Sequence, residues 1–180
     1  MKIKKKKLKS NIAKKPMTKD QKVAYIVEAG VIAAFYVVLM LTNVELAGSA
    51  SLIQIRVAEA LCILPCFTSA AIPGLFIGCL IGNILTGSVI WDVIFGSLAT
   101  LLAAFLTRQL RKKRYLASLP PILVNMFVIP IILTKAAGVE QTIGAVSLGI
   151  GIGEFISAGV LGQLVYSVLD KNRSVFKSQR

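Results

Sequence analysis

The chain has 180 residues, of which 56% are apolar and only 16% are charged, and its formal net charge is +13. A soluble domain carries about 25% charged residues, and several stretches here approach the roughly 20 apolar residues that a membrane span needs. This composition excludes an ordinary soluble domain. It indicates one polytopic, all-α membrane domain and leaves no room for a second domain.

The basic residues gather in three segments, which are 1–22, 108–114 and 170–180, and only Arg56 and Lys135 lie elsewhere. Basic segments beside apolar spans typically mark the cytoplasmic side of a membrane protein. We therefore predict cytoplasmic tails at both termini, the first lying against anionic lipid. A nucleic-acid-binding arm is the alternative for such a run, but this distribution favours the membrane, and no nucleic-acid partner is predicted.

The three cysteines, Cys62, Cys66 and Cys79, lie in apolar stretches, and the sequence has no histidine. An odd number of cysteines without histidine is not the pattern of a disulfide framework or a zinc site. We interpret them as small packing residues, and we predict neither a metal nor a cofactor.

The first predicted span, 23–42, carries small residues four positions apart, at Ala29 and Ala33 and again at Gly30 and Ala34. Small residues at this spacing let another helix approach closely. Two interpretations remain open for them: packing within the chain's own bundle, or docking of a partner membrane subunit.

The number of spans follows from the basic segments, because 1–22 and 108–114 must lie on the same side and an even number of crossings must separate them. The stretch after the first span begins with a polar loop, and 49–55 alternates as an extended segment does. Pro73 and Gly74 then interrupt a long apolar run. We predict a six-helix membrane domain at 23–169 whose spans are 23–42, 56–70, 72–86, 88–107, 118–134 and 141–169.

Ionisable and amide side chains inside membrane spans are costly and therefore mark candidate functional sites. In this topology seven of them share the outer half of the bundle, and they are Gln54, Arg56, Glu59, Asn83, Asp92, Asn125 and Glu154. We predict that they form a solute-binding recess that faces the exterior, with Trp91 beside it.

Each of these residues also has a structural interpretation. Arg56 and Glu59 are three apart and can pair on a helix surface. Trp91 can be an interfacial anchor, and Asp92 can cap the fourth helix. The two asparagines can form hydrogen bonds between helices. Glu154, flanked by Gly153 and Phe155, is the hardest of the set to explain structurally.

Several runs, in this order, resemble the QueT family, and they are Ile53–Leu61, Gly74–Cys79 with Asn83, Asp92–Leu101, Leu119–Pro121, Val124–Asn125 and Gly153–Glu154. The similarity extends from the first to the sixth predicted span. Ala58 and Cys62 depart from it, since the family usually has serine and often threonine at these positions.

The resemblance implies a substrate-binding S component of an energy-coupling factor (ECF) transporter in a bacterial cell membrane, which takes up a queuosine precursor, a 7-deazaguanine base. It implies three partner subunits, namely a transmembrane coupling subunit and two ATP-binding cassette ATPases, and it places the coupling contact at Ala29 and Ala33. The chain itself has no phosphate-binding G-x-x-x-x-G-K-[ST] motif. An S component for another vitamin-like solute and a self-sufficient small transporter remain alternatives, and an enzyme is not predicted.

A guanine-like base offers adjacent N–H donors that one carboxylate can accept together. We hypothesise that Glu59 or Glu154 binds this donor edge, and that the amides of Gln54, Asn83 and Asn125 bind the remaining polar atoms. Trp91 or Phe95 is a candidate for stacking on the base. Arg56 is expected to orient a carboxylate.

Overall fold

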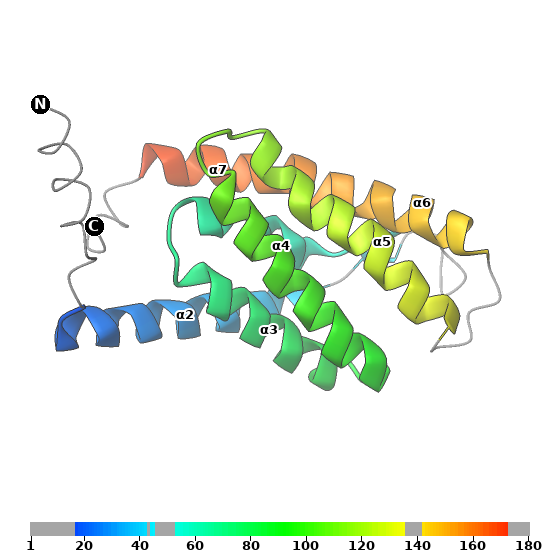
Figure 1. Ribbon diagram of the computed structural model, residues 1–180, viewed down its shortest axis with the longest axis horizontal. Coiled ribbons are helices and arrows are strands. Elements are labelled where there is room, and N and C mark those ends of the chain that lie inside the picture. The colour runs from blue at the N-terminus through cyan, green and yellow to red at the C-terminus, as the bar shows by residue number, and fades with distance from the viewer. Residues whose placement is uncertain (1–16, 43, 46–52, 136–141, 173–180) are drawn as a thin grey trace, which may run out of the picture.

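The computed structural model describes residues 17–42, 44–45, 53–135 and 142–172, and its elements form a bundle of helices (Figure 1). The elements are α2 (Lys19–Met40), β1 (Val44–Glu45), β2 (Gln54–Ile55), η1 (Val57–Cys66), α3 (Ala71–Leu85), η2 (Asp92–Gly96), α4 (Ser97–Gln109), η3 (Leu116–Ser118), α5 (Leu119–Lys135), α6 (Ile143–Glu154), η4 (Phe155–Leu161) and α7 (Gly162–Lys171). Because η2 continues into α4, η3 into α5, and α6 through η4 into α7, these elements make six helical units, as predicted.

Three of the six units are long and apolar enough to cross a membrane, and they are Lys19–Met40, Leu116–Lys135 and Ile143–Lys171. The first begins four residues before the predicted start, because Thr18 and Gln21 form a capping box there. η1 and α3 are shorter apolar helices, so the second predicted span is only the ten residues of η1. At about 2.0 Å per residue, such a 3₁₀ helix is roughly 20 Å long, which is less than the apolar thickness of a bilayer.

The extended segment predicted at 49–55 is present where the structure describes it. Gln54 and Ile55 form β2, which pairs antiparallel with β1 in the register Val44 to Ile55 and Glu45 to Gln54. Residues 49–52 lie outside the described part of the chain. The pair of strands leads directly into η1.

α2 and α3 lie side by side, and the glycines of α3 set how closely they approach. A Cβ atom added at Gly74 would lie 2.8 Å from the carbonyl oxygen of Ala29, and one at Gly78 would lie 2.9 Å from that of Ala33. Real Cβ atoms do not approach so closely, so only glycine allows this contact at the two positions. Ala29 and Ala33 are consequently buried within the bundle.

The two ends of the bundle differ. α2 begins and α7 ends on the left of Figure 1, at the same end as the basic loop between α4 and α5. At the opposite end, α3 turns into η2 through Gly87, whose φ of 70° lies in the left-handed region that favours glycine.

The basic end is fixed by a hydrogen-bonded group of four side chains, which we call the basic-end network and which consists of Arg114, Ser118, Gln163 and Ser167. The Arg114 guanidinium donates to Gln163 Oε1 at 2.9 Å and to Ser167 Oγ at 2.5 Å. Gln163 Nε2 donates to Ser118 Oγ at 2.7 Å. The network joins the loop before α5 to α7.

Candidate functional site

The three buried carboxylates all lie where the backbone departs from an ordinary α-helix. Glu59 belongs to the 3₁₀ helix η1, Asp92 is the first residue of the π-helix η2, and Glu154 immediately precedes the π-helix η4. Short π-helical turns inside α-helices occur frequently at functional sites, and 3₁₀ stretches often mark hinges. The distortions place three acidic groups in the interior of the bundle from three separate units.

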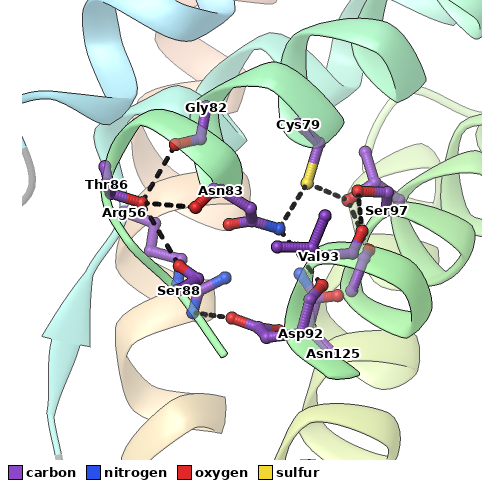
Figure 2. Close-up of polar contacts among 12 residues, drawn as sticks. Arg56, Cys79, Gly82, Asn83, Thr86, Ser88, Asp92, Val93, Ser97 and Asn125 are labelled. Carbon is purple, nitrogen blue, oxygen red and sulfur yellow. Dashed lines mark hydrogen bonds and ion pairs between the residues drawn. The ribbon is translucent and has the colours of Figure 1, made fainter. Parts of the chain in front are cut away.

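Arg56 and Asp92 form an ion pair, with 3.8 Å between Nη2 and Oδ2. Figure 2 shows that Arg56, Asn83 and Asp92 reach this point from different segments of the chain. Asn83 Nδ2 donates to the backbone oxygen of Asp92 at 3.2 Å, which ties α3 to η2. Arg56 therefore pairs with Asp92 rather than with Glu59, and Asp92 lies inside its helical unit instead of capping it.

Glu59 accepts one hydrogen bond at each of its two carboxylate oxygens. The Tyr36 hydroxyl of α2 donates to Glu59 Oε1 at 2.5 Å, and the Cys62 thiol donates to Oε2 at 2.9 Å. All three side chains are buried. A 3₁₀ helix aligns residues three apart, which explains why Cys62 stands next to Glu59.

Glu154 and Asn125 form the third contact. Asn125 Nδ2 of α5 donates to Glu154 Oε1 at 2.7 Å, and both side chains are buried. The second carboxylate oxygen of Glu154 has no hydrogen-bond partner among the described residues.

These contacts form one group, which we call the polar cluster and which consists of Arg56, Glu59, Asn83, Asp92, Asn125 and Glu154. Arg56 lies close enough to Glu59 and Glu154, as well as to Asp92, to interact with all three electrostatically, and Glu59 and Glu154 lie near each other. One guanidinium thus faces three carboxyl groups, so the cluster has an excess of acceptor oxygens.

Within the described part of the chain, four buried side-chain atoms lack a hydrogen-bond partner, and they are Asn83 Oδ1, Asp92 Oδ1, Glu154 Oε2 and Ser157 Oγ. Three of them belong to the polar cluster. A buried polar atom without a partner destabilises a protein by about 1–3 kcal/mol, and native proteins contain few. Their concentration in one place indicates a site prepared for a ligand.

The predicted residue Trp91 is not part of the polar cluster. Trp91 is 49% exposed and stacks on Phe95, with 6.0 Å between the ring centroids. This placement fits an interfacial anchor. Gln54 is in β2, next to Arg56 in the chain, and the side chain of Gln54 lies outside the described part of the structure.

The predicted docking pair, Ala29 and Ala33, is buried against α3. Packing within the chain's own bundle therefore accounts for these two residues, and their contact with a partner stays a prediction. The other small pair of this helix, Gly30 and Ala34, is exposed.

Three residues that belong to the site or border it are not among the predicted site residues. Tyr36 is the only hydroxyl-bearing residue between Tyr25 and Met40. A lone hydroxyl in an apolar span is a signal of a buried hydrogen bond, and Tyr36 makes one to Glu59. Cys62 and Ser157 resemble packing residues in sequence, and their roles require three-dimensional neighbours. In the described residues, no group of three or more Cys, Asp or Glu side chains is placed to hold a metal ion.

The long apolar helices are those of a multi-pass membrane protein, and the buried polar cluster is its candidate functional site. The profile of the QueT transporter family matches residues 26–171. The chain therefore belongs to the QueT transporter family, and it is a transporter rather than an enzyme, as predicted. No curated protein and no solved structure matches the chain.

Proposed function

We propose that the chain is the substrate-binding S component of an ECF transporter and that the polar cluster binds a 7-deazaguanine base, the nucleobase of a queuosine precursor. The observation that carries the proposal is the set of unpaired acceptor oxygens at Asn83, Asp92 and Glu154. A ligand rich in N–H donors would pair them. The donor edge of a guanine-like base is such a ligand.

Of the two carboxylates predicted for the donor edge, Glu154 is the better candidate. Both oxygens of Glu59 already accept hydrogen bonds, from Tyr36 and Cys62. Glu154 has one oxygen held by Asn125 and one unpaired. We assign the donor edge to Glu154, an orienting role to Arg56 through Asp92, and a scaffold role to Glu59.

Such a site would also discriminate between bases. A ligand that lacks a matching donor leaves buried acceptors unpaired, and sites of this kind reject the wrong ligand by large factors. Stacking on Trp91 is not part of the proposal, since Trp91 and Phe95 stack on each other.

The binding part of the proposal is tested by calorimetry on the detergent-purified protein. The probes are 7-deazaguanine, its 7-cyano and 7-aminomethyl derivatives, guanine and unrelated vitamins. We expect saturable 1:1 binding of at least one deazaguanine and none of the vitamins. Binding of a vitamin in place of every deazaguanine would overturn the assignment of the ligand.

The transport part rests on the absence of an ATP-binding motif in the sequence. We expect uptake of the base into proteoliposomes only when the coupling subunit and two ATPases are present with ATP. Uptake by the chain alone would identify a self-sufficient transporter instead.

The orientation is also proposed. The basic segments favour cytoplasmic termini, which places Asp92 and the end of α3 toward the exterior. A membrane-impermeant thiol reagent should therefore label Ser88→Cys, in the α3–η2 turn, from outside intact cells in a chain whose own cysteines are replaced. Labelling only after the membrane is opened would reverse the topology.

A further inference from the structure

Ser157 lies three residues after Glu154 in the chain and is not among the residues that the hydrogen bonds of the polar cluster connect. It is a residue of the π-helix η4, and the buried residues of this stretch are Gly153, Glu154, Ser157 and Ala158. Glu154 and Ser157 are both buried, so both side chains of this stretch point into the bundle.

The elements packed against η4 carry residues of the polar cluster. A Cβ atom added at Gly159 of η4 would lie 3.7 Å from Ile122 Cδ1 of α5, and one at Gly162, where α7 begins, would lie 3.6 Å from the carbonyl oxygen of Ala60 of η1. η4 thus packs between η1 and α5, the elements that carry Glu59 and Asn125.

The Ser157 hydroxyl has no hydrogen-bond partner among the described residues although the side chain is fully buried. A serine within a helix usually satisfies itself by donating to the carbonyl oxygen four residues earlier. Ser97, which is equally buried and adjoins the π-helix η2, does so, with 2.6 Å between Ser97 Oγ and the Val93 oxygen. The two serines therefore differ in whether the buried hydroxyl has a partner.

Of the four unpaired groups, Ser157 is the one that carries a donor whatever the protonation state of the carboxyl groups. Asn83 Oδ1 is an acceptor oxygen, Asp92 Oδ1 and Glu154 Oε2 accept in the proposed function, and a hydroxyl carries one donor. On a guanine-like base, the two N–H donors that a carboxylate accepts are flanked by acceptor atoms, the ring nitrogen on one side and the carbonyl oxygen on the other. A donor beside Glu154 would complete recognition of that edge.

We propose that Ser157 is a specificity-determining ligand contact, which donates its hydroxyl proton to an acceptor atom beside the donor edge that Glu154 binds. The inference rests on the proposed function, because it takes a 7-deazaguanine base as the ligand. It adds a requirement for an acceptor on the ligand, which the cluster's oxygens do not impose.

The test compares Ser157→Ala with Ser97→Ala in the full-length protein. Two quantities are measured for each variant: the unfolding temperature without ligand, and the affinity for 7-deazaguanine by calorimetry. Removal of an unpaired buried hydroxyl should stabilise the empty protein, so we expect Ser157→Ala to raise the unfolding temperature by roughly 2–4 °C. The same variant should bind the base about tenfold more weakly, which is about 1.4 kcal/mol.

Ser97→Ala should do the reverse, because it removes a hydrogen bond that is made without ligand. We expect a lower unfolding temperature and an affinity within about twofold of the wild type. If Ser157→Ala binds 7-deazaguanine as tightly as the wild type does, the proposed contact is wrong. If the wild type does not bind any deazaguanine, the proposed function fails, which is a separate result.

Discussion

The part of the chain that the structure describes contains a network of polar side chains at the basic end and another in the interior. The two networks differ in how many of their buried polar atoms have hydrogen-bond partners. In the basic-end network, Arg114 and Gln163 use their donors and acceptors on each other, on Ser118 and on Ser167. The Arg114 guanidinium also lies 4.9 Å from the centre of the Tyr166 ring. In the polar cluster, three acceptor oxygens remain unpaired in the part of the chain that the structure describes.

The comparison indicates what each network is for. The chain can join its helices with hydrogen-bonded side chains that leave no buried atom unpaired in the described residues, as the basic end demonstrates. An incomplete network in the interior, where an unpaired group destabilises most, is therefore better explained by ligand binding than by poor packing. Substitutions at the basic end should lower stability without changing affinity, and substitutions at the residues of the polar cluster that carry the unpaired oxygens should lower affinity with little loss of stability.

The largest effect is expected for Glu154→Gln. The substitution keeps the size of the side chain but removes its charge and replaces one acceptor oxygen with a donor. Truncating one partner of a buried, charged hydrogen bond costs 2–5 kcal/mol, so calorimetry should show an affinity for 7-deazaguanine that is roughly 100-fold lower. Asp20→Asn, in the exposed first turn of α2, is the control. Undiminished affinity would remove Glu154 from the site.

Arg114→Ala should have the next largest effect, and on stability only. It leaves Gln163 and Ser167 without their charged donor, at a cost of about 2 kcal/mol. The unfolding temperature in detergent should fall by roughly 4–8 °C, while the affinity for the base stays within about twofold. Lys113→Ala, at the exposed neighbouring position, should change neither quantity. A large loss of affinity in Arg114→Ala would mean that the two networks are coupled.

Gly96→Ala tests the geometry of the Arg56–Asp92 pair without changing any charge. A Cβ atom at Gly96 would lie 2.6 Å from Asp92 Oδ1, so the carboxylate must move. We expect about tenfold weaker binding, which corresponds to about 1.4 kcal/mol. Gly144→Ala, where nothing lies within 4 Å of the added atom, provides the control. Equal affinities in the two variants would show that the position of Asp92 does not matter.

Glu59→Gln should have the smallest effect on affinity. It separates the residues of the polar cluster that bind the ligand from a residue that only supports them. Because both carboxylate oxygens are already bonded within the chain, the variant should lose about 1 kcal/mol of stability and change the affinity by less than about threefold. Thermal unfolding and calorimetry on one preparation measure both. A loss of affinity as large as that of Glu154→Gln would place Glu59 in contact with the ligand.

Much of the fold could be predicted from the sequence because membrane insertion depends on few properties. Apolar length and the positions of lysine and arginine gave six helices, and Gly74 and Gly78 gave a close helix contact. The 3₁₀ helix at 57–66 and the π-helices at 92–96 and 155–161 could not be predicted. Hydropathy measures which residues are apolar, but it does not distinguish between the hydrogen-bond patterns of these helices.

The candidate site was predicted in part for a similar reason. Charges such as Arg56 and Asp92 are conspicuous in an apolar sequence, so the residues were found. Their pairing was not found, since Tyr36 meets Glu59 across 23 positions of sequence and Asn125 meets Glu154 across 29. Trp91 was expected beside the recess, and it faces outward because its helix presents its buried face at Asp92 and Val93.

The most direct test of the central claim is a crystal structure of the protein with 7-deazaguanine bound. The account predicts that the base lies in the polar cluster, with one of its nitrogen atoms within about 3.2 Å of Glu154 Oε2 and with the unpaired oxygens of Asn83 and Asp92 newly bonded. A base bound elsewhere, with these oxygens each paired to water, would contradict it.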